Sequence, residues 1–374
     1  MIALNDLNRQ YERIQTEINH AVSGVLAHGK YIMGPEVTLL EQRLAEYVGS
    51  RYAVSCGSGT DALLMTLMAW GIGPGDAVFT TPFTFIATAE TARMLGAVPV
   101  FVDIDPATFN LNAELLEPAI QKAKNKGLTP RAVIPVDLFG LPADYEQILT
   151  VANQYGLLVL EDAAQSFGAV YKVKRTGRLC NAAATSFFPS KPLGCYGDGG
   201  AVFTDDPDLY EKLRSIRVHG QGESKYDNIR LGINGRLDTI QAAVLLVKLG
   251  VLDSELAMRQ SVAERYTNGL ENVVVTPQIP EYCRSSWAQY SVLAKDGRER
   301  KEMQDRLLSK GIQSAIYYPK PLHLQSAFSD LGYVPGDMPV AEGISSRIFS
   351  LPMHPYLNSE EIEEVILALR AHPE

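Results

Sequence analysis

The regular alternation of short apolar runs with helical segments is the feature that most constrains the fold of this chain. It extends through the first two-thirds of the 374 residues. We expect strands at residues 53–56, 77–82, 99–104, 132–140, 157–164, 184–188 and 200–204. Helices are expected between them, most clearly over residues 144–156. This alternation, with strands that are apolar almost throughout, is typical of a mainly parallel α/β sheet covered by helices on both faces.

The length of the chain is suited to two α/β domains rather than one small core. We expect a large domain over residues 1–250 and a smaller α/β domain over residues 251–374. Residues 1–18 have the pattern of an amphipathic helix and lack the apolar segment of a signal peptide.

Charge and cysteine usage narrow the class of protein. The formal net charge of −9 argues against general nucleic-acid binding but leaves room for a local basic pocket. No apolar run approaches the roughly 20 residues of a membrane span, so we expect no membrane partner. The four cysteines form no CxxC pair, and no histidine spacing suggests a metal. These features favour a reducing, cytoplasmic location without a bound metal.

Polar clusters follow several of the expected strands, where ligands bind in parallel sheets. The first is the glycine turn that runs from Ser55 to Asp61 and leads into a helix. Gly59 and Thr60 would place free N–H groups and a hydroxyl at the helix start, which suits a phosphate. A simple helix cap with turning glycines explains the same residues, and both readings stay open.

The second cluster contains Asp162, directly after a buried strand. A carboxylate there is costly unless it meets a cation or good donors. The ring nitrogen of pyridoxal 5′-phosphate (PLP) would be such a partner, whereas a helix-capping aspartate is the alternative.

The third cluster contains Lys191, between an aromatic strand end and a glycine-rich reversal. Apolar surroundings would lower its pKa and free the amine for covalent attachment to an aldehyde. Most lysines are solvated surface residues, so this interpretation depends on the other two clusters. A phosphate turn, an acidic strand end and a lysine on one sheet together predict one PLP site.

The motifs that carry these residues resemble a known family, the sugar-nucleotide aminotransferases of the DegT/StrS group, which are fold-type I PLP enzymes. The resemblance covers nearly the whole chain. It is carried by HGKYIMGPEV, SCGSGTDALLMTL, TPFTFIATAE, EDAAQSFGA, SFFPSKPLGCYGDGGAVFT, INGRLDTIQAA and LPMHPYL. Within the family, the match is strongest to enzymes that aminate carbon 3 of UDP-2-acetamido-2-deoxy-ribo-hexuluronate for bacterial O-antigen lipopolysaccharide. The resemblance implies L-glutamate as amino donor and a homodimer with shared active sites.

The resemblance also implies roles for individual residues. Lys191 would be the catalytic, cofactor-bearing lysine. The cofactor, in its pyridoxal or pyridoxamine form (PLP or PMP), would be held by Gly59, Thr60, Phe85, Asp162, Gln165, Ser186 and Lys191, and by Asn234 from the second subunit. The nucleotide sugar would contact Gly29, Tyr31, Ser190, Arg236, Tyr317 and Tyr318. Arg236 is suited to a carboxylate because guanidinium binds carboxylates in a bidentate manner.

One departure from the family affects the substrate. The relatives tend to have His-Tyr-Pro where this chain has Tyr317-Tyr318-Pro319. Tyrosine can stack or donate a hydrogen bond, but it supplies no imidazole cation. Another 3- or 4-keto sugar linked to UDP or dTDP therefore stays an alternative. A sugar dehydratase would have histidine in place of Lys191, and a non-catalytic sensor would not need Lys191, Asp162 and Gln165 together.

Overall fold

The computed structural model describes residues 1–371. Its helices are α1 (Leu7–His28), α2 (Pro35–Val48), α3 (Gly59–Ala69), α4 (Ala87–Met94), α5 (Leu116–Asn125), α6 (Tyr145–Tyr155), α7 (Pro207–Ile216), α8 (Thr239–Leu249), α9 (Leu252–Gly269), α10 (Gly297–Ser309), α11 (Pro339–Arg347) and α12 (Ser359–Arg370). Short 3-10 helices are η1 (Ala113–Leu115), η2 (Leu138–Gly140), η3 (Leu322–Leu324) and η4 (Ser326–Leu331). Within these residues, no helix combines the length and the apolar character that crossing a bilayer requires.

The strands form three sheets. They are β1 (Tyr52–Cys56), β2 (Asp76–Thr80), β3 (Val98–Phe101), β4 (Thr129–Ile134), β5 (Leu158–Asp162), β6 (Val170–Tyr171), β7 (Lys174–Arg175), β8 (Ala182–Ser186), β9 (Gly200–Thr204), β10 (Cys283–Arg284), β11 (Tyr290–Leu293) and β12 (Ile348–Leu351). The main sheet has seven strands in the order β1-β9-β8-β5-β4-β2-β3. Its ladders are parallel except where β9 pairs with β1 and β8.

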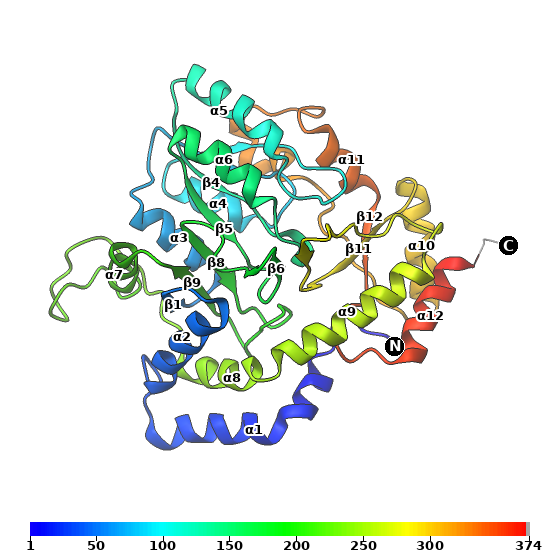
Figure 1. Ribbon diagram of the computed structural model, residues 1–374, viewed down its shortest axis with the longest axis horizontal. Helices are drawn as coiled ribbons and strands as arrows, with labels where there is room; N and C mark the ends of the chain where they lie inside the picture. Colours follow the sequence, from blue (N-terminus) through cyan, green and yellow to red (C-terminus); the bar gives the residue numbers. More distant parts are fainter. Residues whose placement is uncertain (372–374) are drawn as a thin grey trace.

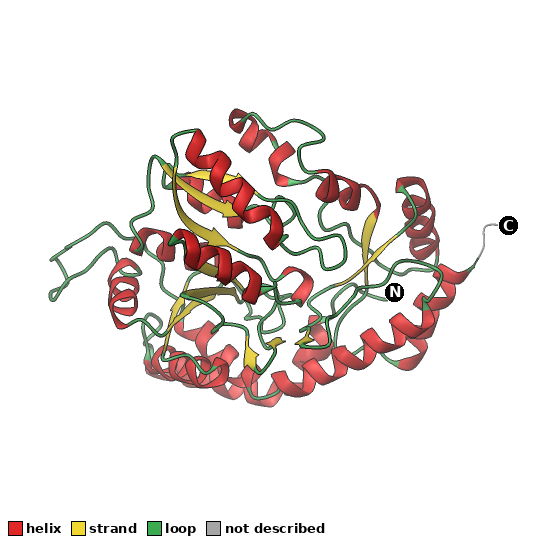
Figure 2. Ribbon diagram, turned by 45° about the horizontal axis from the view of Figure 1, so that its top comes forward, coloured by secondary structure: helices red, strands yellow, loops and turns green. Residues whose placement is uncertain are grey.

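Helices cover both faces of the main sheet, because successive side chains of its strands point to opposite sides. Val78 packs with α3, α4 and α7, whereas the next residue, Phe79, packs with α5 and α6. Ala53 and Phe203 pack with α2 and α8. Figure 2 shows the yellow strands of this sheet lying between red helices. The predicted α/β fold with a mainly parallel sheet is therefore confirmed.

A separate cluster of buried apolar residues joins α9, α10 and α12 to the two-stranded sheet of β11 and β12. Figure 1 shows α9 running from the side of the main sheet towards these C-terminal elements. Ile2 belongs to this cluster and lies beside Ile312, so the first residues of the chain pack against the C-terminal part. The division at residues 250 and 251 stays a prediction.

Several predicted elements need correction at their ends. The strands expected over residues 99–104, 157–164 and 184–188 are β3 (Val98–Phe101), β5 (Leu158–Asp162) and β8 (Ala182–Ser186). The expected strand over residues 132–140 is β4, which begins at Thr129 and ends at Ile134. Pro135 follows, and a proline has no N–H to continue a ladder. The strand expected over residues 77–82 likewise ends at Thr80, before Pro82. The N-terminal helix begins at Leu7, where the side chain of Asp6 caps it.

Candidate functional site

The carboxyl ends of β1, β5 and β8 meet at one edge of the main sheet. Ser186, the last residue of β8, pairs with Gly200 at the start of β9, and Gly200 also pairs with Cys56 at the end of β1. Asp162 ends β5, the neighbour of β8. The polar clusters predicted from the sequence therefore lie on one edge, as expected for a parallel sheet.

The glycine turn after β1 brings the start of α3 close to the end of β8. Ser58 caps α3 by accepting a hydrogen bond from the N–H of Asp61 at 3.0 Å. A Cβ at Gly59 would lie 2.7 Å from the Cβ of Ser186, and one at Gly200 would lie 2.4 Å from the carbonyl oxygen of Ser58. Only glycine fits such contacts. The first N–H groups of α3 and the Ser186 hydroxyl thus share one corner, which suits a phosphate.

Asp162 is a buried carboxylate held by two donors. The Thr88 hydroxyl donates to Oδ2 at 2.8 Å, and the N–H of Ala164 donates to Oδ1 at 3.2 Å. Burial raises the pKa of Asp162, and both donors and the charge of Lys191 oppose that rise. The carboxylate is therefore prepared for a cationic partner in the site.

Lys191 lies on the loop after β8, where its own N–H donates to the carbonyl of Phe188 at 2.9 Å. Protein surrounds its side chain except where it faces the pocket, and this burial lowers the pKa of Lys191. The charge of Asp162 acts in the opposite direction. A lowered pKa increases the fraction of uncharged amine, which is the form that attacks a carbonyl carbon.

Gln165 links the sheet edge to an aromatic wall. Its Oε1 accepts from the N–H of Phe139 at 2.6 Å, and its Nε2 donates to the hydroxyl of Tyr318 at 3.1 Å. This leaves the second Nε2 hydrogen of Gln165, and the hydroxyl hydrogen of Tyr318, for a ligand. Phe83 packs edge-on against Tyr318, with ring centroids 6.1 Å apart.

One pocket of about 570 Å³ gathers most of the predicted site residues. The predicted residues that line it are Gly59, Thr60, Phe85, Asp162, Gln165, Ser186, Ser190, Lys191, Tyr317 and Tyr318. Its volume lies within the range typical of small-molecule sites. We call this cavity the cofactor pocket.

The other four predicted residues, Gly29, Tyr31, Asn234 and Arg236, do not line this pocket. They belong to two neighbouring segments, because the N–H of Thr239 donates to the carbonyl of Tyr31 at 2.9 Å. The second segment also approaches the phosphate corner, since the N–H of Gly57 donates to the carbonyl of Gly235 at 3.0 Å. We call residues 29–34 and 234–239 the second group.

Several residues of the cofactor pocket were not predicted. Thr88, Asp198 and Gln289 line it beside the expected residues. Thr88 and Asp198 lie within the motifs TPFTFIATAE and GDGGA, but nothing in their spacing distinguishes them from ordinary helix and loop residues. Gln289 precedes β11, far along the chain, and only the folded structure places it here.

Comparison with known proteins identifies the family. A sequence profile of the DegT/DnrJ/EryC1/StrS aminotransferase family matches residues 12–370. The UDP-2-acetamido-2-deoxy-3-oxo-D-glucuronate aminotransferase of Pseudomonas aeruginosa is 50% identical over 372 residues, which is 99% of each chain.

Solved structures agree with this match. A DegT DnrJ EryC1 StrS aminotransferase from Brucella abortus superposes with a TM-score of 0.96 at 50% identity and covers 99% of each chain. NtdA from Bacillus subtilis, solved with bound PMP, has a TM-score of 0.88 at 30% identity over 98% of this chain and 82% of its own. The resemblance predicted from the sequence is confirmed, and the chain belongs to the DegT/DnrJ/EryC1/StrS aminotransferase family.

Proposed function

We propose that this protein is a PLP-dependent aminotransferase that moves an amino group from L-glutamate to carbon 3 of UDP-2-acetamido-2-deoxy-ribo-hexuluronate. The observation that carries the proposal is the presence of Lys191 and Asp162 in one pocket, each influencing the pKa of the other. Pairs of titratable groups shifted by burial in a cleft are typical of catalytic sites.

The residues of the cofactor pocket fit PLP. Gly59, Thr60 and Ser186 would hold the phosphate at the corner that glycine keeps open. Asp162 would hold the ring nitrogen protonated, while Gln165 has a free Nε2 hydrogen for the ring hydroxyl. The side chain of Phe85, 57% exposed, offers a face for the ring. When bound, PLP supplies an aldehyde that accepts and returns nitrogen and a ring that withdraws electrons.

Lys191 would perform the proton transfers. Its Nζ can accept a proton from the α carbon of glutamate, because burial favours the uncharged amine. It can later return a proton to the sugar carbon that gains nitrogen. Glutamate leaves as 2-oxoglutarate, and the keto-sugar enters the same pocket in the second half of the reaction.

Borohydride reduction tests the cofactor assignment. The purified protein should be yellow, and reduction should fix the colour to the peptide that contains Lys191, as read by mass spectrometry. A colourless protein, or one that L-glutamate does not change spectrally, would overturn the proposal and favour a non-catalytic sensor.

The active unit is proposed to be a homodimer in which the second group of one copy completes the pocket of the other. Lys191 is the only cation among the described residues that line the cofactor pocket, whereas Asp162 and Asp198 add negative charge. A diphosphate and a carboxylate require more positive charge than this. Arg236 is half-buried and its Nε has no hydrogen-bond partner, so its guanidinium is available to a ligand. Tyr31 and Ile32, 47% and 49% exposed, suit burial by a second copy.

The uronate is supported by the name of the Pseudomonas aeruginosa relative, a 3-oxo-glucuronate aminotransferase. A role in bacterial O-antigen lipopolysaccharide synthesis and a cytoplasmic location belong to the same proposal. The test is a panel of keto-sugar nucleotides with L-glutamate, in which the uronate should be the most efficient substrate. A neutral 3- or 4-keto sugar nucleotide that reacts faster would overturn the choice of sugar, but it would not affect the assignment as an aminotransferase.

Arg236→Lys tests the recognition of the uronate carboxylate. Lysine keeps the charge but loses the bidentate contact, so kcat/KM for the uronate should fall about tenfold or more. The loss for the neutral hexulose analogue should be smaller. Equal losses on both substrates would mean that Arg236 serves the cofactor or the dimer.

A further inference from the structure

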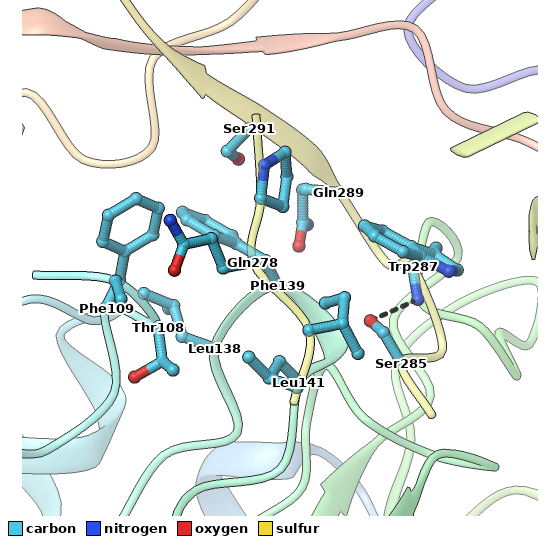
Figure 3. Close-up of a pocket in the computed structure, with 13 residues that line it drawn as sticks. Thr108, Phe109, Leu138, Phe139, Leu141, Gln278, Ser285, Trp287, Gln289 and Ser291 are labelled. Carbon is cyan, nitrogen blue, oxygen red and sulfur yellow. Dashed lines mark hydrogen bonds between the residues drawn. The ribbon is translucent and has the colours of Figure 1, made fainter. Parts of the chain in front are cut away.

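Gln289 lines both the cofactor pocket and a second, small chamber, which Figure 3 shows. The chamber has a volume of about 20 Å³, which is room for a single water molecule. It is too small for a substrate. Any larger ligand of Gln289 must therefore enter from the cofactor pocket.

Strained backbone holds the wall around Gln289 in place. Phe109, Phe139 and Trp287 all line the chamber and have positive φ values of 63°, 57° and 51°. Bulky residues rarely adopt this left-handed region, and such strain tends to gather around ligand sites. The N–H of Gln289 donates to the carbonyl of Phe139 at 3.4 Å, which ties Gln289 to this wall.

The carboxamide of Gln289 has no partner within the described residues. Its Oε1 is buried without a hydrogen bond, and no acceptor in residues 1–371 meets its Nε2. Figure 3 shows the side chain directed into the space between Gln278 and Trp287. With the oxygen buried, Nε2 carries the unpaired donors of Gln289, a residue that lines the cofactor pocket as well as the chamber.

A second donor lies on the same wall. Phe139 connects Gln289 to Gln165, and Gln165 donates to the hydroxyl of Tyr318 at 3.1 Å. Because that hydroxyl already accepts from Gln165, its own hydrogen is free to donate. The wall therefore offers two neutral donors, Gln289 Nε2 and Tyr318 Oη, which together suit an anionic oxygen.

We propose that Gln289, together with Tyr318, binds a carboxylate of the amino-acid donor. This inference rests on the proposed function, in which donor and keto-sugar use the pocket in turn. The donor carries a carboxylate on the carbon that loses nitrogen, so its partners must lie in the pocket itself. Lys191 is needed for proton transfer, and Arg236 is assigned to the sugar. The neutral donors of Gln289 and Tyr318 are therefore the groups that we assign to this carboxylate. Neutral donors bind a carboxylate less tightly than guanidinium does, and this suits a product that must leave after each half-reaction.

The test compares the two half-reactions in the holoenzyme of Gln289→Leu. Glutarate, a dicarboxylate without an amino group, serves as an equilibrium probe in calorimetry. We expect about tenfold weaker glutarate binding and a similar fall in the efficiency of the glutamate half-reaction. The reaction of the pyridoxamine form with the keto-sugar nucleotide should fall less than the glutamate half-reaction does, because the carboxylate of the sugar is assigned to Arg236.

Two further variants sharpen the result. Gln289→Glu keeps the shape and adds a negative charge, so glutarate binding should fall further than in Gln289→Leu. Gln278→Leu is the matched control, since Gln278 lines the chamber but not the cofactor pocket, and it should behave as the wild type. Unchanged glutarate binding in both Gln289 variants, or equal losses in both half-reactions, would overturn the inference. A wild-type protein that glutamate does not convert would instead overturn the proposed function.

Discussion

At the scale of single residues, burial acts in opposite directions on Lys191 and Asp162. It lowers the pKa of the amine and raises the pKa of the carboxyl, so each group loses part of its preference for the charged form. Their mutual attraction limits both shifts. This balance increases the uncharged fraction of the Lys191 amine and places it in one pocket with a carboxyl group that can meet a cation.

Lys191→Ala should abolish transamination, because the lysine is both the covalent tether and the proton carrier. The variant should still fold and bind PMP, since no hydrogen bond of the Lys191 side chain holds the described structure together. Single-turnover absorbance measurements with L-glutamate provide the test. Lys122→Ala, on an exposed residue of α5 that does not line the cofactor pocket, is the control and should retain full activity. Appreciable turnover by Lys191→Ala would remove Lys191 from its proposed role.

Thr88→Val tests how Asp162 is kept ionised. The Thr88 hydroxyl holds the pKa of Asp162 down, so its removal should raise that pKa further. Asp162 is active when ionised, and activity is lost as the pH falls through its pKa. The acid limb of the kcat/KM profile should therefore move to higher pH, with about tenfold weaker cofactor affinity. Thr91→Val, on the same helix but bonded only to the carbonyl of Ala87, should leave the profile unchanged. An unmoved limb in Thr88→Val would contradict this account.

At the scale of elements, the phosphate corner depends on how closely α3 approaches β8 and β9. Gly59→Ala would place a Cβ 2.7 Å from the Cβ of Ser186, and neither atom belongs to a flexible chain end. Such overpacking costs about 1–3 kcal/mol, and we expect both a lower unfolding temperature and weaker PLP affinity. Thermal unfolding and cofactor titration measure the two effects. Gly343→Ala, with no atom within 4 Å of the added Cβ, is the matched control. Normal PLP affinity in Gly59→Ala would show that the phosphate corner can accommodate the added methyl group.

The sequence predicted the elements well and their tertiary neighbours poorly. The polar clusters around Asp162 and Ser186 could be assigned to one sheet edge because apolar runs stop near them and parallel strands share that edge, although the expected strands ran two residues further, to 164 and 188. Pro135 moved the end of β4 because the missing N–H outweighs the apolar residues that follow. Gln289 and Thr88 could not be found from the sequence, since their roles depend on contacts between elements that periodicity does not encode. The division of roles between two copies came only from the family resemblance.

At the scale of the whole molecule, the predicted site residues separate into two sets. One set lines the cofactor pocket, and the other, which belongs to the second group, lies beside the phosphate corner without lining that pocket. The hydrogen bond from Gly57 to Gly235 joins the two sets. The phosphate corner of one site is therefore connected to the segment that would complete the site of the partner subunit. Two copies related by a twofold axis would each complete the pocket of the partner.

Mixed dimers test this arrangement directly. Lys191→Ala and Arg236→Ala should each be inactive alone, because every site lacks one essential group. After subunit exchange, a heterodimer contains one site with neither defect, and random mixing should restore about a quarter of wild-type activity. The matched control mixes Lys191→Ala with Asp162→Asn, whose defects both fall on residues that line the cofactor pocket of their own chain. That mixture should stay inactive, since each site of its heterodimer carries one of the two defects. Absence of recovery in the test pair despite proven exchange would mean that each site is built within one chain, whereas recovery in the control would mean that Lys191 and Asp162 of one chain do not serve the same site.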